Sequence, residues 1–219
     1  MRIATWNIER LKHQQQLNEI ITACNRARAD ILILTETDIQ VQPDYPFGFH
    51  TPRLDESQPV CNKPTENRVS IYTNYHCISH YSTYDEHTAL CVELDTEKGN
   101  LIVNGTIIGL YVNRHENFRM DLPKQIEDFN RLSSKCHNLC ICGDFNLSFS
   151  DGYYYTKRGR SILSDCFSKL DISILTAEQP QCIDHIAVSN KFIGTAEIQV
   201  EEWNQGKGLS DHKGIVVEF

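Results

Sequence analysis

A short apolar segment leads into two polar residues that could do chemistry. Residues 139–142 are uncharged, as is typical of a strand buried on both faces of a sheet, and Asp144 and Asn146 follow. In extended backbone, residues two positions apart point to the same side. A carboxylate and a carboxamide in one cleft could bind a hard cation, orient a water molecule and hold a phosphate oxygen. The alternative is a strand that ends in an ordinary Asx turn.

The chain repeats this pattern of an acid or amide at a strand end. The further candidates are Asn7 in strand 2–8, Glu36 after strand 31–35, Asp184 in strand 183–188, and Asp211 and His212 before strand 213–219. Such repetition is what a polar site at one edge of a sheet requires. Asp184 is the hardest to explain as mere structure, because a buried carboxylate is costly unless it is paired. His212 could supply the partner.

Five short motifs come in a set order along the chain. They are Thr-Trp-Asn-Ile at 5–8, Thr-Glu at 35–36, Gly-Asp-Phe-Asn at 143–146, Ile-Asp-His-Ile at 183–186 and Ser-Asp-His at 210–212. Their order and spacing resemble the endonuclease/exonuclease/phosphatase superfamily, whose members include exonuclease III, deoxyribonuclease I, neutral sphingomyelinases and inositol polyphosphate 5-phosphatases. Each motif is weak alone, but the resemblance spans residues 3–219. It implies an α/β fold, a four-layer α/β/β/α sandwich of two packed mixed sheets with outer helices.

The resemblance also implies a metal site for Mg²⁺ or Mn²⁺. Glu36 would be the main ligand, and Asn7 would support it with its carbonyl oxygen. Asp211 would either bind a second metal or support the residues that contact the first one. An acid at a strand end suits Mg²⁺, which takes few protein carboxylates and keeps its waters. The alternatives are a turn residue for Asn7 and a helix cap for Glu36.

The resemblance implies that four further residues do the chemistry. Asp144 would act as a base or orient the attacking water, and Asn146 would hold a phosphate oxygen. Asp184 and His212 would form a carboxylate–imidazole pair in which the carboxylate holds the ring protonated or in one tautomer. His212 would then face the phosphoryl oxygen.

Candidate substrate contacts lie near another predicted strand end. Nucleases of the family often place a Tyr followed by an Asn here, which points to Tyr111 and Asn113; the alternative for Tyr111 is a core aromatic with its tip in water. Arg114 and His115 add local positive charge. Arg68 could approach a phosphate, although an exposed surface position is the default for Arg.

Three adjacent tyrosines at 153–155 are followed by basic residues at 157, 158 and 160. This segment mixes stacking surface with positive charge, as single-strand nucleic-acid sites do. Half-buried loop packing explains the tyrosines equally well.

Composition sets the outer bounds. With 219 residues, 40% hydrophobic and 23% charged, the chain fits one soluble globular domain over residues 1–219. No apolar stretch approaches the length needed to span a bilayer, and Met1-Arg2 leads directly into a strand. We therefore expect a cytoplasmic protein, with a monomer as the default state.

Charge and cysteine content narrow the classes further. A net charge of −8 argues against a broad non-specific nucleic-acid platform, because neutralising phosphates takes Lys and Arg. It does not exclude a nuclease, because a metal-dependent site is itself acidic. Nine Cys in a chain of this size indicate a reducing compartment rather than a disulfide framework. A zinc site at Cys136, His137, Cys140 and Cys142 is disfavoured, since two of these Cys fall in a buried strand.

Hydrophobic periodicity predicts the elements that position these residues. The predicted strands lie at 2–8, 31–35, 68–74, 77–83, 88–95, 101–109, 139–143, 183–188, 195–201 and 213–219. The predicted helices lie at 12–29, 121–136, with Pro123 in its first turn, and 159–168. Residues 97–100 form a plausible hairpin turn, and 38–66 read as irregular.

Three functions are compatible with these observations. The first is a metal-dependent phosphodiesterase acting on nucleic acid. The second is a phosphatase or phosphodiesterase for a small phosphorylated metabolite, phosphoinositide or phospholipid, which the acidic charge favours. The third is a binding module that kept the fold and lost turnover, although the intact set of polar residues argues against it. Family endonucleases that act on abasic sites are usually longer, which puts duplex-specific repair in doubt.

Overall fold

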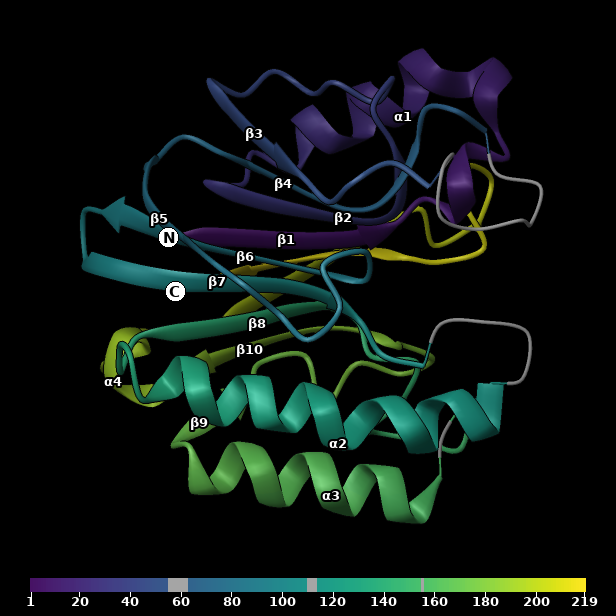
Figure 1. Cartoon of the computed structure of the whole chain (residues 1–219). Helices are drawn as coiled ribbons and strands as arrows, with labels where there is room; N and C mark the ends of the chain where they lie inside the picture. Colours follow the sequence, from purple (N-terminus) through teal and green to yellow (C-terminus); the bar gives the residue numbers. More distant parts are fainter. Residues whose placement is uncertain (55–62, 110–113, 155) are drawn as a thin grey trace.

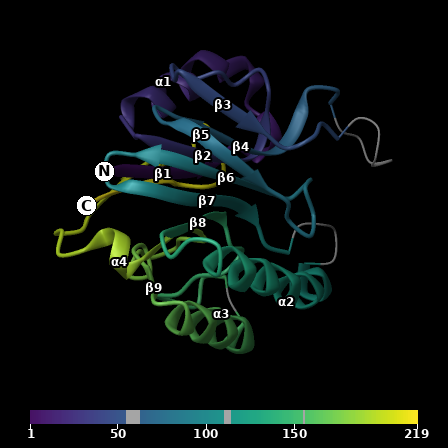
Figure 2. The same ribbon diagram turned by 60° about the vertical axis from the view of Figure 1, so that its left-hand side comes forward.

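Two six-stranded sheets pack face to face between layers of helix (Figure 1). The structure is a computed structural model that describes residues 1–54, 63–109, 114–154 and 156–219, with residues 114–117 described in backbone only. Helix α1 (Leu17–Arg26) covers the outer face of one sheet. Helices α2 (Arg114–Ser133) and α3 (Lys157–Lys169) cover the outer face of the other (Figure 2). The predicted α/β/β/α sandwich is therefore confirmed.

Sheet A is built from both ends of the chain. Its order is β11-β12-β1-β2-β4-β3. Strand β1 pairs antiparallel with β12 and parallel with β2, so the sheet is mixed. Its strands are β1 (Arg2–Asn7), β2 (Ile31–Asp38), β3 (Phe47–His50), β4 (Glu66–Thr73), β11 (Gln199–Trp203) and β12 (Gly214–Glu218).

Sheet B comes from the middle of the chain and is also mixed. Its order is β5-β6-β7-β8-β10-β9, and β7 and β8 are its parallel pair. Its strands are β5 (His76–Tyr81), β6 (Ala89–Thr96), β7 (Gly99–Ile107), β8 (Leu139–Asp144), β9 (Ile172–Ile174) and β10 (Asp184–Ser189). Helix α4 (Asn190–Ile193) follows β10 directly.

The main core lies between the sheets. Alternate residues of the central strands, such as Ile3, Ile33, Val103 and Ile186, are fully buried there. Smaller clusters fill the space under α1 and under α2 and α3. Because both faces of the central strands are covered, their sequences read as continuous apolar runs rather than as alternating patterns.

Several element boundaries differ from the sequence prediction. The first helix is shorter than 12–29, because two 3-10 turns, Glu9–Leu11 and Gln14–Gln16, precede α1. Helix α2 begins seven residues before the predicted start at 121, so Pro123 lies inside the helix and not in its first turn.

Short elements escaped the prediction altogether. Strand β3 lies within the segment read as irregular, and β9 and α4 were not predicted. The strand predicted at 195–201 is β11, which begins later, at Gln199. The hairpin at residues 97–100 is confirmed, because Thr96 pairs with Gly99 across the turn. Among the described residues, no helix is long and apolar enough to cross a membrane.

One glycine sets the direction of the chain at the end of β8. Gly143 has φ of +135°, and a Cβ added there would lie 2.1 Å from the Thr106 carbonyl oxygen of the neighbouring strand. Glycine is therefore required immediately before Asp144, both for its dihedral angle and for the close approach of the two strands.

We expect Gly143→Ala to destabilise the fold by about 3 kcal/mol, since positive φ and overpacking each cost about 1–2 kcal/mol. Gly99→Ala is the matched control, because Gly99 has φ of +101° but open space around it. Its cost should be about 1 kcal/mol. Urea unfolding of both variants measures the difference, and equal losses would show that the contact with Thr106 is unimportant.

Candidate active site

Two carboxylates from adjacent strands form the centre of the site. Asp144 at the end of β8 and Asp184 at the start of β10 are register partners in sheet B. They are 1% and 2% exposed. The antiparallel pairing thus fixes two acids, which lie 40 residues apart in sequence, opposite each other inside the protein.

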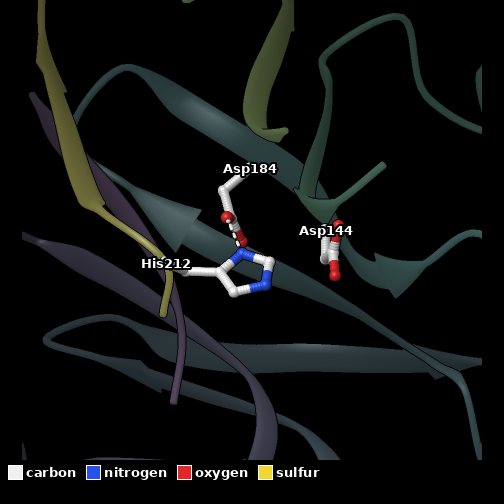
Figure 3. Close-up of side chains that lie close together, drawn as sticks. All are labelled: Asp144, Asp184 and His212. Carbon is white, nitrogen blue, oxygen red and sulfur yellow. Dashed lines mark hydrogen bonds and ion pairs between the residues drawn. The ribbon is translucent and has the colours of Figure 1, made fainter. Parts of the chain in front are cut away.

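An imidazole from the other sheet completes this group (Figure 3). His212 precedes β12 of sheet A, and its Nδ1 lies 2.6 Å from Asp184 Oδ2. Asp144, Asp184 and His212 each offer one possible metal-ligand atom, and these three atoms lie within 4.8 Å of one another. The predicted pairing of Asp184 with His212 is thus present in the structure, and it joins the two sheets at the site.

The side chain of Asn7 connects Asp144 to a third acid, Glu36. Its Nδ2 donates to Asp144 Oδ2 at 3.0 Å and to Glu36 Oε1 at 3.3 Å. Its carbonyl oxygen accepts from the backbone N–H of Glu9 at 2.8 Å, which fixes the orientation of the amide. Asn7 therefore faces the carboxylates with its nitrogen, whereas the sequence prediction had its carbonyl oxygen supporting a metal.

Two site residues lie in strained backbone. Glu36 has φ of 42° in the middle of β2, and Asn146 has φ of 49°. The backbone N–H of Asn146 donates to Asp144 Oδ1 at 2.8 Å, which makes the turn an Asx turn, and its Nδ2 donates to the Ile108 carbonyl at 3.0 Å. The Asx turn that was the alternative for Gly-Asp-Phe-Asn is thus present, and it lies within a cluster of polar side chains. Non-glycine residues at positive φ cluster at functional sites.

The surroundings raise the pKa of both Asp144 and His212. Burial raises the pKa of Asp144. The charges of Asp184 and Glu36 raise it further and that of His212 lowers it, so that the pKa of Asp144 is about 7. Burial alone would lower the pKa of His212, but the Asp184 carboxylate overcomes this and raises it to about 10. At neutral pH His212 is therefore an imidazolium, and Asp144 is poised to gain or lose a proton.

Neighbouring residues hold His212 in place through its backbone. Trp6 Nε1 and Asn204 Nδ2 both donate to the His212 carbonyl, at 3.2 and 2.7 Å. Ser210 Oγ accepts from the backbone N–H of His212 and donates to the backbone carbonyl of Asn7 at 2.6 Å. Trp6 and Ser210 lie within the sequence motifs, although only the structure reveals their contacts. No sequence signal pointed to Asn204.

The other predicted residues are more scattered. Asp211 is exposed, and its Oδ1 lies 3.7 Å from His212 Nε2. Arg68 is only 8% exposed, so the alternative of an exposed surface arginine is wrong. Tyr111 and Asn113 lie outside the described residues, as do the side chains of Arg114 and His115.

One histidine of the Ile-Asp-His-Ile motif is structural. His185 is buried, and its ring contacts Thr176 Oγ1 at 2.8 Å and the Leu147 carbonyl at 2.9 Å. Burial lowers its pKa to about 4, so the ring is neutral at pH 7. It fills its position as a satisfied core residue.

The acids fit a hard divalent cation. The buried carboxylates of Asp144 and Asp184 lie beside His212, and the half-buried Glu36 carboxylate is joined to Asp144 through Asn7. Asp184 Oδ1 is buried with no hydrogen-bond partner among the described residues. Such an excess of buried oxygen ligands suits Mg²⁺ or Mn²⁺. Protonated His212 is unsuited as a ligand, because metal-bound imidazole must be neutral. Cys140 and Cys142 are buried in β8, in agreement with the rejection of a zinc site.

A model of the Endonuclease/Exonuclease/phosphatase family matches residues 4–212. The chain belongs to this family. Its members are hydrolases that act on phosphoester bonds and depend in general on divalent metals, so the chain is a phosphoesterase. A comparison with curated protein sequences found no match.

Solved structures of the family share the fold end to end. The 3'-5' exonuclease NExo from Neisseria meningitidis superposes with a TM-score of 0.71 at 16% identity, over 100% of this chain and 99% of that chain. An AP endonuclease from Archaeoglobus fulgidus gives 0.69 at 12%, over 100% and 99%. Sphingomyelinase C from Streptomyces griseocarneus gives 0.65 at 13%, over 99% and 98%. At these identities the likeness shows a common fold.

The pairing of His212 with Asp184 predicts an unusual titration. In metal-free protein we expect the His212 ring to remain protonated up to about pH 10. Asp184→Asn removes the carboxylate that raises the pKa most, so the ring should titrate well below the wild-type midpoint. Two-dimensional ¹H–¹⁵N NMR of the histidine rings measures both midpoints, with His212→Ala for assignment.

Asp211→Asn is the control, because it removes a carboxylate that is 3.7 Å rather than 2.6 Å from the ring. Its effect on the midpoint should be the smaller of the two. A wild-type midpoint near 6.5 would contradict the ion pair.

Proposed function

We propose that this phosphoesterase is a Mg²⁺- or Mn²⁺-dependent phosphodiesterase that cleaves nucleic acid. The observation that carries the proposal is a buried Asp144 with a pKa of about 7, beside an imidazolium that Asp184 holds. When water attacks a phosphodiester, a base whose pKa is near 7 can take its proton, and a positively charged side chain held in place can stabilise the new negative charge.

In this proposal, Asp144 accepts the proton of the attacking water. Its carboxylate is held on both oxygens, by Asn7 Nδ2 and by the Asn146 N–H, so it keeps one orientation. A pKa close to ambient pH maximises the product of the ionised fraction and the strength of the base. Asn146 is proposed to contact a phosphate oxygen through its side chain.

His212 is proposed to bind the phosphoryl oxygen. Because Nδ1 is committed to Asp184 at 2.6 Å, the ring has only Nε2–H left to donate. A preorganised imidazolium stabilises the negative charge that develops in the transition state without reorganising at that moment. Asp184 acts through His212, as a positioning residue.

Glu36 is the proposed ligand of the divalent cation, with Asp211 as a candidate for a second one. When bound, the ion supplies charge neutralisation at the phosphoryl oxygen and a more acidic water. Asn7 keeps the Glu36 and Asp144 carboxylates beside each other, which we favour over direct ligation through its carbonyl oxygen. Tyr111, Asn113, Arg68, Arg114 and His115 remain predicted substrate contacts.

Nucleic acid is favoured as the substrate because two of the similar solved structures are nucleases by name. The second candidate substrate is a small phosphate ester or a phospholipid. The net charge of −8 favours it, and sphingomyelinase C has the same fold. A single domain over residues 1–219, a monomer and a cytoplasmic location stay predictions.

We expect Asp144→Asn and His212→Ala each to lower turnover by about 10²–10⁴-fold, because each removes a group that acts on the reacting atoms. Both variants should keep the fold, as judged by circular dichroism. The assay offers single-stranded and duplex DNA, RNA, and soluble and lipid phosphate esters, with Mg²⁺ or Mn²⁺.

Loss of polynucleotide cleavage in both variants would support the proposal. Full activity in either one would exclude that residue from catalysis. Turnover confined to small or lipid esters would replace the nuclease assignment by the second candidate.

Glu36→Gln should act through the metal. It removes one ligand charge, so we expect the Mg²⁺ concentration for half-maximal activity to rise at least about tenfold, with partial rescue at high Mg²⁺. Glu127→Gln on the exposed face of α2 is the control, because it changes the net charge equally. Identical Mg²⁺ titrations for wild type and Glu36→Gln would remove Glu36 from the ligand set.

A further inference from the structure

A second group of residues borders the active site on the side of two loops. A pocket beside Asp184 and His212 is lined also by Tyr153, Gln181, Lys207 and Lys213. Tyr153 belongs to the run of tyrosines in the sequence, and Lys207 lies in the loop between β11 and β12. Nothing in the proposed chemistry uses either residue.

Tyr153 presents an aromatic ring to solvent at this position. It is 47% exposed, one of the few large apolar side chains so open among the described residues. Lys207 Nζ is 3.1 Å from the Tyr153 hydroxyl oxygen but 5.3 Å from the ring centroid. The ammonium therefore lies beyond the hydroxyl end of the ring, and it does not cover a face of the ring.

The two lysines of the pocket differ in their partners. Lys213 Nζ is bound to Glu202 Oε1 at 2.7 Å and to the Pro180 carbonyl at 2.8 Å. Among the described residues, no carboxylate lies within salt-bridge distance of Lys207. In a chain with net charge −8, Lys207 is thus a cation beside the active site whose charge is not neutralised by an acid.

Both loops are held firmly. Asp151 Oδ1 accepts from Ser148 Oγ at 2.6 Å and from the Tyr153 N–H at 3.0 Å, while its Oδ2 accepts from the Gln181 N–H at 2.8 Å. On the other side, Asn204 accepts from the N–H groups of Lys207 and Leu209. The backbone that carries the ring and the ammonium is therefore held in place, which lowers the part of the entropy cost of binding that comes from ordering loops.

We infer that Tyr153 and Lys207 form a nucleotide subsite next to the phosphoryl centre, in which a base stacks on the Tyr153 ring and Lys207 binds the adjoining phosphate. The inference rests on the proposed function and names its substrate class as a base-bearing phosphodiester. A stacking face with a cation at its edge matches a nucleotide, since every base has a π-face and carries a phosphate nearby. A lipid headgroup or a sugar phosphate offers no planar group to stack.

Ligand binding tests the subsite without relying on turnover. Deoxyadenosine monophosphate and deoxyribose 5-phosphate are titrated into the full-length Asp144→Asn protein, which keeps the pocket, while ring-labelled tyrosine signals are followed by NMR. We expect the nucleotide to bind about tenfold more tightly than the sugar phosphate and to shift the Tyr153 signals. Tyr153→Ala should abolish this preference, and Tyr153→Phe should retain it because stacking survives.

Two further variants separate the roles. Lys207→Gln should weaken both ligands to the same extent and reduce the salt dependence of binding, because one phosphate contact is lost. Tyr84→Ala is the matched control, since Tyr84 is also exposed, at 40%, and has Lys124 Nζ 5.4 Å from its ring centroid, but does not line this pocket. It should leave the preference unchanged.

Equal affinity for the nucleotide and the sugar phosphate would overturn the subsite. So would a preference that survives in Tyr153→Ala. These outcomes are distinct from failure of the proposed function: a wild-type protein that binds the nucleotide through Tyr153 but cleaves no polynucleotide would refute the nuclease assignment and leave the subsite standing. A protein that cleaves polynucleotides but binds the two probes equally would refute the subsite and leave the nuclease assignment standing.

Discussion

Two carboxylates face each other inside this protein, and the arrangement of the site follows from accommodating their charge. Asp144 and Asp184 are register partners on β8 and β10, and the charge of Asp184 raises the cost of ionising Asp144. An unpaired buried charge costs several kcal/mol, so partners are obligatory. His212 supplies the positive charge, and Asn7 supplies an N–H to Asp144. Both partners come from sheet A, so the chemistry requires the two sheets to stay in contact.

Much of the fold and site could be predicted, because the physical signals are local. Uncharged runs such as residues 139–142 mark strands that are covered on both faces, and a polar residue at the end of each marks the edge of the sheet. Asp184 stood out because a carboxylate in an apolar strand needs a partner. The pairing with His212 was expected from the family motifs and is present at 2.6 Å.

Other features depend on contacts between distant residues and left no local signal. The orientation of Asn7 is set by the Glu9 N–H and two acids on other strands, and Glu36 lies at positive φ within a strand. Helix α2 begins seven residues before its predicted start, with Pro123 in its interior. A Pro in a helix interior removes one backbone hydrogen bond, so the sequence favoured a helix that begins close to Pro123. Strand β3, which pairs with β4, is four residues long and therefore too short for a periodic signal.

Strand β12 lies between β11 and β1 in sheet A, with His212 immediately before it. During synthesis on the ribosome, Asn7, Glu36, Asp144 and Asp184 are all made before His212 and before the strand that closes this sheet. Of these five residues His212 is therefore the last to be made, and the group of side chains is complete only once β12 has paired with both β11 and β1.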